Sequence, residues 1–365
     1  MLSLTSFLSN RGPSQHDAML HEDVVKAMYQ GILERPIDPE SLVRCVDSLK
    51  NGGSLVQIIW DISHSEEFKL KNPQDSNLVV KLPDLTKIYP DRYSSKGDGT
   101  TIYHAKDDDG VAFMEKLIND YRYYDSFGIW SPIVDTDKKI TAGIVESLGG
   151  KKVIELGCFA GAALSVMKNN GLDVLGVELS HRAFLLADSN IVQNIKYGDL
   201  LDVNLYGTFD AFLGMDILEH LSPLKLDLYI EKIRELIGEN GFAYINSPMF
   251  GVDRIFGTVF SQYLPTWQEV GDAKYWYDMH CDETGWPMHG HLVWASPVWW
   301  EQLFARHGLF RDDTAEAMLQ DAMDPFFQSN APARKSFFVL RLEGAKPDHA
   351  ELKDRIAQHI LPLIG

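Results

Sequence analysis

Short apolar runs alternate with amphipathic stretches through the second half of the chain. The apolar runs predict buried strands, and stretches with apolar residues at every third or fourth position predict helices. Strands that alternate with helices favour a mostly parallel sheet covered on both faces. The expected fold class of this part is therefore α/β, with a doubly wound sheet. Strands are predicted at 152–156, 173–178, 194–197, 209–215, 241–246 and 335–342, and helices at 161–169, 181–189, 223–237 and 296–307.

Three shorter helical patterns come first, within residues 1–72. Pro36 ends the first pattern, Asp38 can cap the second, and the third begins at Ser54. These patterns predict a small all-helical domain. Its sequence, from EDVVKAMYQG to SHSEEF, resembles a bacterial helical domain of unknown function that occurs beside glycan-handling enzymes. The resemblance implies that this domain contacts a glycan-assembly protein or a second copy of the chain.

Changes in composition predict the remaining boundaries. Residues 73–110 are rich in Asp, Lys, Pro, Ser and Gly, which is typical of a linker. The α/β pattern occupies 111–345, and 346–365 are expected to form a C-terminal helix. Within the α/β part, 248–295 form an insert rich in tryptophan and tyrosine.

The charge of the chain excludes some partners. There are 34 Lys and Arg residues against 52 Asp and Glu, a formal net charge of −18, and such a field repels nucleic acid and anionic membranes. The three cysteines match neither a disulfide framework nor a metal-ligand spacing. The first residues lack a signal-peptide pattern, and no apolar run is long enough to cross a membrane. We therefore expect a cytoplasmic globular protein without a nucleic-acid partner.

A glycine-containing turn follows the first predicted strand of the α/β part. Gly157 and Gly161 let the backbone approach a ligand closely, at the sheet edge where open α/β folds bind ligands. The spacing does not fit the dinucleotide fingerprint, because Phe159 stands where its second glycine falls. The next strand ends in Glu178, which can accept both ribose hydroxyls, and the third is followed by Asp199, which can accept from an adenine amino group. These residues together predict an adenosine site.

This set of motifs resembles the Rossmann-like S-adenosylmethionine-dependent methyltransferases over residues 150–342. The resemblance also includes the segments FDAFLGMDILEHL and IGENGFAYINSP. It implies a seven-stranded sheet and S-adenosylmethionine as cofactor, with Glu155 near the methionine amino group. The residues implied to bind the cofactor are Glu155, Gly157, Cys158, Phe159, Gly161, Glu178, Leu179, Asp199, Leu200 and Met215.

The string Asp216-Ile-Leu-Glu219-His220 follows the fourth strand. On a helix these three polar side chains stand at i, i+3 and i+4 and can enter one cleft. Methyl transfer to oxygen needs the acceptor proton removed, by a histidine base or through a divalent cation such as Mg²⁺. The string resembles E-x-x-E-H of ubiquinone-pathway and small-RNA 2′-O-methyltransferases, which implies a metal held by Asp216, Glu219 and His220. A metal, a direct base and a purely structural role are the three alternatives.

A second histidine pair, His289 and His291, lies in GWPMHGHLVWAS. In an extended segment residues two apart face the same side, so both imidazoles can enter one cleft. Either ring, like that of His220, could be the catalytic base, or could complete a metal site with Glu219 and His220. A hydrogen-bonded structural histidine is the alternative for each.

Six of the eight tryptophans fall within 248–300. Flat aromatic faces suit pyranose rings, and neighbouring acids can accept from sugar hydroxyls. We therefore expect an O-methyltransferase that acts on a saccharide or glycoconjugate hydroxyl in bacterial polysaccharide assembly. The alternatives are a small phenolic or quinone-like acceptor and a non-catalytic binding protein. The aromatic residues could instead form a local core of the long insert.

Overall fold

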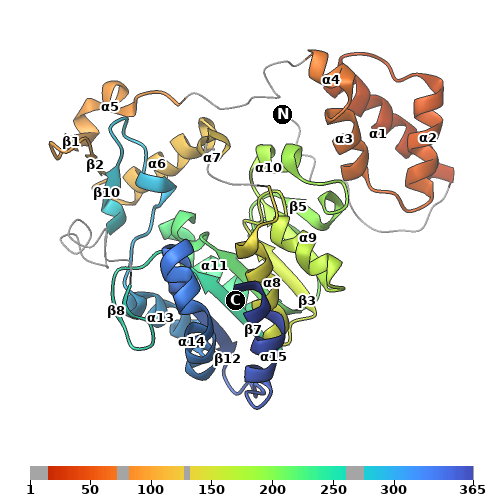
Figure 1. Ribbon diagram of the computed structural model, residues 1–365. Helices are drawn as coiled ribbons and strands as arrows, with labels where there is room; N and C mark the ends of the chain where they lie inside the picture. The colour runs from red at the N-terminus through yellow and green to blue at the C-terminus, as the bar shows by residue number, and fades with distance from the viewer. Residues whose placement is uncertain (1–14, 72–81, 127–131, 260–274, 365) are drawn as a thin grey trace. The chain divides into compact units, whose positions relative to one another are not determined.

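The computed structural model describes residues 15–71, 82–126, 132–259 and 275–364. The chain divides into two compact units, Met1–Leu78 and Val79–Gly365. The described part of the first unit is helical (Figure 1) and consists of α1 (Gln15–Leu33), α2 (Pro39–Lys50), α3 (Leu55–Ser63) and α4 (Glu66–Lys71). Its buried core contains Val25, Tyr29, Leu33, Cys45, Val46, Ile58 and Ile62.

The helix starts of the first unit follow from local sequence. The Asp38 carboxylate accepts the Ser41 amide at 2.8 Å, and Pro39 occupies the first turn of α2, where a missing N–H costs nothing. The Ser54 hydroxyl oxygen accepts the Val56 amide at 3.1 Å and caps α3. The predicted starts at Asp38 and Ser54 are confirmed.

A seven-stranded sheet forms the centre of the second unit (Figure 1). Its strand order is β11-β12-β7-β6-β3-β4-β5, and β12 runs antiparallel to both of its neighbours. The six predicted strands are all present, with shifted starts at β5, β7 and β12, and β11 is additional. The strands are β3 (Lys152–Leu156), β4 (Asp173–Glu178), β5 (Ile195–Tyr197), β6 (Phe209–Met215), β7 (Ile237–Asn246), β11 (Leu309–Arg311) and β12 (Phe337–Leu342).

The sheet is doubly wound. The chain steps from β3 to β4 and β5 on one side of the sheet, and later to β6 and β7 on the other. Because crossovers between parallel strands are right-handed, α9 covers the face opposite to α11, and the expected fold class is confirmed. The helices of this unit are α5 (Leu85–Ile88), α6 (Asp108–Asp120), α7 (Tyr123–Ser126), α8 (Thr136–Ser147), α9 (Ala162–Asn169), α10 (His181–Leu186), α11 (Leu226–Leu236), α13 (Pro297–Arg306), α14 (Asp313–Asn330), α15 (Leu352–His359) and α16 (Leu361–Ile364).

The prediction of a linker at 73–110 is wrong for the part that the structure describes, residues 82–110. A small antiparallel sheet begins there, in the order β1-β2-β10, and β10 belongs to the aromatic insert. Tyr103, Met279 and Trp286 are buried together in one core, so the two segments fold as one. Such short strands contain only isolated apolar residues, so the composition of the segment did not reveal the strands. The strands are β1 (Tyr93–Ser95), β2 (Thr101–His104) and β10 (Asp278–Cys281).

Two differences concern helices near the end of the chain. The single helix expected at 346–365 is divided into α15 and α16, because Pro362 has no N–H to continue the hydrogen-bond pattern of α15. The sequence patterns missed α14, which contains Pro325 within it. In the part of the chain that the structure describes, no helix is long and apolar enough to cross a membrane.

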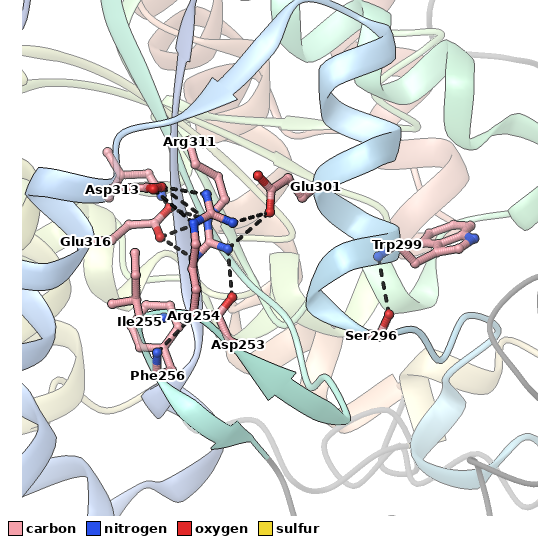
Figure 2. Close-up of polar contacts among 11 residues, drawn as sticks. Asp253, Arg254, Ile255, Phe256, Ser296, Trp299, Glu301, Arg311, Asp313 and Glu316 are labelled. Atoms are coloured by element: carbon pink, nitrogen blue, oxygen red, sulfur yellow. Dashed lines mark hydrogen bonds and ion pairs between the residues drawn. The ribbon is translucent and has the colours of Figure 1, made fainter.

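A buried arginine ties the start of the insert to the sheet (Figure 2). The side chain of Arg311, on β11, is 1% exposed and donates to Asp253 Oδ2 at 2.7 Å and to Glu316 Oε2 at 2.5 Å. Asp253 ends β8 (Gly251–Asp253), which pairs with β9 (Gly257–Val259). The β8–β9 hairpin is thereby fixed to β11 and α14.

Candidate functional site

The carboxyl ends of β3, β4, β5 and β6 meet at one edge of the sheet, because these strands are parallel. The loop after β3 lies there, with positive φ angles at Gly157 (68°), Phe159 (46°) and Gly161 (74°). The positive φ of Gly157 favours glycine, and a Cβ atom there would also lie 2.6 Å from Ile217 Cδ1. Phe159 adopts a conformation that side chains rarely take, and strain of this kind, on the order of 1–3 kcal/mol, is typical of binding sites.

Glu178, at the end of β4, holds this loop in place. Its Oε2 accepts the Phe159 amide at 2.7 Å, and its Oε1 accepts the amides of Leu179 at 2.8 Å and Ser180 at 2.7 Å. Burial raises the pKa of Glu178, although the three amides oppose that rise. Glu178 therefore organises the loop that the sequence assigns to the cofactor. Its contact with ribose hydroxyls stays a prediction.

Asp199 follows β5 at the same edge. Its Oδ2 accepts the Tyr229 hydroxyl at 2.6 Å and its Oδ1 accepts the Leu201 amide at 2.9 Å. Tyr229 lies on α11, and nothing in the sequence marked it as a partner of Asp199. Each carboxylate oxygen has a further lone pair, so the predicted adenine contact is compatible with these bonds.

The apolar residues assigned to the cofactor differ in exposure. Leu179 is 55% exposed and Met215 is partly buried at the end of β6. Cys158 and Leu200 are buried, so they offer little surface to a ligand at this edge. The four residues do not all offer side-chain contacts.

Glu155, on β3, is buried behind the glycine loop. Its Oε2 has no hydrogen-bond partner in the described part of the chain. Burial raises the pKa of Glu155 to about 7, and the charge of Arg334 opposes that rise. A buried carboxylate oxygen without a donor is the arrangement that an ammonium group would complete.

Three side chains with metal-binding atoms converge at the end of β6. Glu219 and His220 lie on a short 3-10 turn, and His291 follows another such turn at 288–290. Glu219 Oε1 lies 4.0 Å from His220 Nε2 and 3.9 Å from His291 Nε2. One donor atom of each residue lies within 4.8 Å of the other two. We call Glu219, His220 and His291 the Glu-His-His cluster.

Neighbouring groups orient two of these donor atoms. The Ser247 hydroxyl donates to Glu219 Oε2 at 2.9 Å, and His220 Nδ1 lies 3.0 Å from the Gly290 carbonyl oxygen. That carbonyl can only accept, so the His220 proton sits on Nδ1 and Nε2 keeps its lone pair. Glu219 Oε1 and His220 Nε2 have no hydrogen-bond partner among the described residues.

Burial also sets the charge state of the cluster. Burial and the nearby charge of Asp216 raise the pKa of Glu219 well above its usual value. Burial lowers the pKa of His220 to about 4, and it lowers that of His291 as well. Both imidazoles are therefore neutral near pH 7, which is the form that binds metals.

The structure does not bring Asp216 into the cluster. Asp216 has a φ of 49° and does not continue into a helix, so the i, i+3, i+4 geometry expected from the string is absent. Its Oδ2 lies 2.8 Å from Arg334 Nη1. Arg334 also donates to Asn246 Oδ1 at 2.8 Å. Asp216, which the sequence analysis expected beside Glu219 and His220, therefore lies outside the Glu-His-His cluster, and His291 lies there instead.

His289 lies beside the cluster but outside it. Its φ is 56°, its side chain is exposed, and its ring centroid lies 5.7 Å from that of His291. The two histidines are not in an extended segment, because His289 lies within the 3-10 turn that His291 follows. The predicted roles of His220, His289 and His291 as bases stay predictions.

Most of the described tryptophans within 248–300 are core residues. Trp286, Trp294 and Trp300 are 0%, 1% and 1% exposed, so they cannot form a platform for a sugar. Trp276 and Trp299 are partly exposed, with ring centroids 6.1 Å apart. Trp267 lies outside the described residues. The alternative of a local core is correct for three of the five described rings.

Three residues of the site went unrecognised in these roles. Ser247, which orients Glu219, follows directly on the buried strand β7, and that position was a usable signal. Arg334 lies far from Asp216 in the sequence, and no motif links them. Tyr124 lies on α7, and its hydroxyl is 3.2 Å from the Gly290 carbonyl oxygen.

The sheet order, with one antiparallel strand next to the last, defines a Rossmann-like methyltransferase fold. Among curated proteins, a ubiquinone biosynthesis O-methyltransferase of Paraburkholderia phymatum is 26% identical over 137 residues, which are 35% of this chain and 58% of that protein. Another, from Acinetobacter baumannii, is 33% identical over 82 residues, which are 20% of this chain and 35% of that protein. The chain thus spans less than two thirds of the length of these relatives.

Solved structures also resemble the chain. One is a 1,6-didemethyltoxoflavin-N1-methyltransferase of Burkholderia thailandensis with bound S-adenosylhomocysteine, at 14% identity and a TM-score of 0.39. The match covers 60% of this chain and 89% of that one. No protein-family model matches the chain.

Proposed function

We propose that the chain is an S-adenosylmethionine-dependent O-methyltransferase that activates its acceptor hydroxyl with a divalent cation. The observation that carries the proposal is the Glu-His-His cluster, in which two buried donor atoms lack hydrogen-bond partners among the described residues. The similarity to ubiquinone biosynthesis O-methyltransferases supports the reaction class.

The residues of the candidate site fit both a divalent cation and S-adenosylmethionine. One carboxylate oxygen and two neutral imidazoles suit a divalent transition metal better than Mg²⁺, which prefers oxygen ligands. A bound cation would also satisfy buried polar atoms that are costly to leave without a partner. On the cofactor side, Glu155 Oε2 lacks a donor that the methionine ammonium would supply. The loop after β3 is already held open by Glu178 through the Phe159 amide.

S-adenosylmethionine, when bound, supplies an electrophilic methyl group, and a divalent cation lowers the pKa of a hydroxyl beside it. The side chains of this protein hold and orient these groups. Gly290 keeps the His220 proton on Nδ1 and Ser247 occupies Glu219 Oε2, so that Nε2 and Oε1 face the same point. Placing an activated oxygen near the methyl donor is itself a large part of such catalysis.

Two acceptor classes are consistent with the site. The burial of Trp286, Trp294 and Trp300 removes three of the aromatic faces expected to bind a saccharide, and this favours a small phenolic or quinone-like acceptor. The names of the curated relatives agree with that choice. The partly exposed pair of Trp276 and Trp299 is the observation that supports a saccharide acceptor.

The test is transfer of a labelled methyl group to panels of phenols and saccharides, with and without EDTA. We expect chelation to abolish turnover, added Mg²⁺ or Mn²⁺ to restore it, and the affinity for S-adenosylhomocysteine to stay unchanged. Glu219→Gln should act as chelation does. Turnover that survives EDTA but falls by roughly 100-fold or more in His289→Ala would replace the cation with a histidine base. A chain that binds no S-adenosylhomocysteine in calorimetry would be a non-catalytic binding protein.

A further inference from the structure

The short helix α7 contacts two distant segments of the second unit, residues 287–290 and the region of Ser180, through three consecutive residues. The Tyr123 hydroxyl donates to the Pro287 carbonyl oxygen at 3.1 Å. The Tyr124 hydroxyl lies 3.2 Å from the Gly290 carbonyl oxygen. The Asp125 carboxylate accepts the Ser180 hydroxyl at 2.6 Å. One turn of helix therefore contacts both the cluster segments and the residues after Glu178.

Tyr124 lies against the Glu-His-His cluster. Its hydroxyl is shared between the Gly290 carbonyl and the His220 carbonyl, the latter at 3.3 Å, and its ring packs edge-on against the His220 ring at 5.5 Å. The Gly290 carbonyl is the acceptor that fixes the His220 proton on Nδ1. Tyr124 thus holds the group that sets which nitrogen of His220 is free to bind a cation.

Asp125 lies against the cofactor side. It is 4% exposed, and it accepts the Arg182 amide at 3.3 Å in addition to the Ser180 hydroxyl. The Ser180 amide in turn donates to Glu178 Oε1 at 2.7 Å. Any ligand that fixes the segment after Glu178 therefore also fixes Asp125, and with it α7.

We propose that α7 couples the two halves of the site, with Tyr124 and Asp125 as positioning residues, so that an occupied cofactor site strengthens cation binding at the Glu-His-His cluster. This proposal rests on the function proposed above. Coupling between two sites is reciprocal, so a bound cation strengthens cofactor binding by the same factor. The cluster therefore binds a cation most tightly when the methyl donor is in place.

The experiment is a titration of the full chain with Mn²⁺, followed by electron paramagnetic resonance, with and without saturating S-adenosylhomocysteine. We expect the ligand to tighten Mn²⁺ binding by about 5-fold or more, the usual lower bound of such coupling. In Tyr124→Phe the tightening should disappear, while S-adenosylhomocysteine alone binds as in the wild type. In Asp125→Asn it should also disappear. Tyr121→Phe, which removes a hydroxyl just before α7, is the matched control and should retain it.

The outcomes separate the two proposals. Mn²⁺ binding that is unaffected by S-adenosylhomocysteine overturns the coupling and leaves the cation site intact. No Mn²⁺ binding under either condition overturns the cation site and the coupling together. Coupling that persists in Tyr124→Phe removes Tyr124 from the path, and a purely structural role of α7 would lower the melting temperature without changing the ratio of the two Mn²⁺ affinities.

Discussion

Arg334 Nη1 lies 2.8 Å from Asp216 Oδ2, inside the motif that also supplies Glu219 and His220. Burial by itself would lower the pKa of the guanidinium, but the charges of Asp216 and Asp137 raise it, so the group stays protonated. The pairing withdraws Asp216 from cation binding, because its carboxylate already faces a full positive charge. Asp216 therefore pairs with Arg334, whereas Glu219, three residues further on, belongs to the Glu-His-His cluster.

Asp216→Asn should consequently leave Mn²⁺ affinity close to that of the wild type. Glu219→Gln should lower it by more than about 10-fold, since loss of a ligand exceeds the usual cost of losing an orienting partner. Titration of both variants with Mn²⁺ checks this, and equal S-adenosylhomocysteine affinities would show that both are folded. Equal losses in the two variants would return Asp216 to the ligand set.

The binding of S-adenosylhomocysteine should depend on pH through Glu155. The pKa of this carboxyl is raised to about 7, so it is protonated below that pH and charged above it. Only the charged form attracts the ligand's ammonium, so affinity should rise with pH from about 6 to about 7, by up to about tenfold per unit. Calorimetry across that range checks the sign.

Glu155→Gln is the control for this pH dependence. Its amide cannot ionise, so the affinity should be lower at neutral pH and nearly constant as pH falls. A wild type whose affinity decreases as pH rises, or a variant with the same slope as the wild type, would contradict the assignment of the ammonium to Glu155.

Glu178→Ala should lower both the affinity for the cofactor and the stability of the protein. Three amides lose their acceptor, and each buried donor left without one costs about 1–3 kcal/mol. The drop in melting temperature and in S-adenosylhomocysteine affinity should therefore occur together. The neighbouring Leu179→Ala is the control for the melting temperature alone, because the loss of an exposed side chain changes stability by no more than about 0.5 kcal/mol. Wild-type stability in Glu178→Ala would show that the loop does not depend on this carboxylate.

Much of the fold was predictable because its signals are local. The apolar run Lys152–Leu156 is a strand whose ends agree with the prediction, since a turn with glycine follows it at once. β1 and β2 were not predicted because strands of three or four residues show little periodicity. β1 pairs with β2, and β2 pairs with β10, which lies far along the chain. Helix α14 was not predicted because a proline, here Pro325, normally ends a helical pattern.

The candidate site was predictable only in its residue types. Glu219, His220 and His291 were all marked by the sequence, but the cluster depends on a turn at Asp216 with a positive φ, which no spacing rule anticipates. The tryptophans were expected to form a binding face, but three of them are buried. Trp286 is fully buried because β1, β2 and α6 pack around it, and a composition argument cannot distinguish a core from a binding face.

Arg311 and Arg254 form ion pairs around the β8–β9 hairpin, and the two sets of pairs differ in burial (Figure 2). Comparing them tests how burial changes the contribution of an ion pair to stability. Arg311 is 1% exposed and pairs with Asp253 and Glu316, which are 2% and 0% exposed. Arg254 is 45% exposed and pairs with Glu301 and Asp313 at comparable distances of 2.5 Å and 2.7 Å. Arg311 also lies 3.4 Å from Glu301 Oε2, so the two arginines share that carboxylate. The closest pairs of the two arginines differ mainly in their access to water.

Arg311→Met should lower the free energy of unfolding by about 3–5 kcal/mol, because it leaves buried carboxylates without a partner. Arg254→Met should cost about 1 kcal/mol or less, since solvent replaces the lost interactions. Urea denaturation of both variants measures the difference. Similar losses would mean that the surface pairs fix the hairpin as much as the buried ones do. A stable Arg311→Met protein would mean that Asp253 and Glu316 are protonated in the native state, in which case its stability should fall as pH rises through their pKa values.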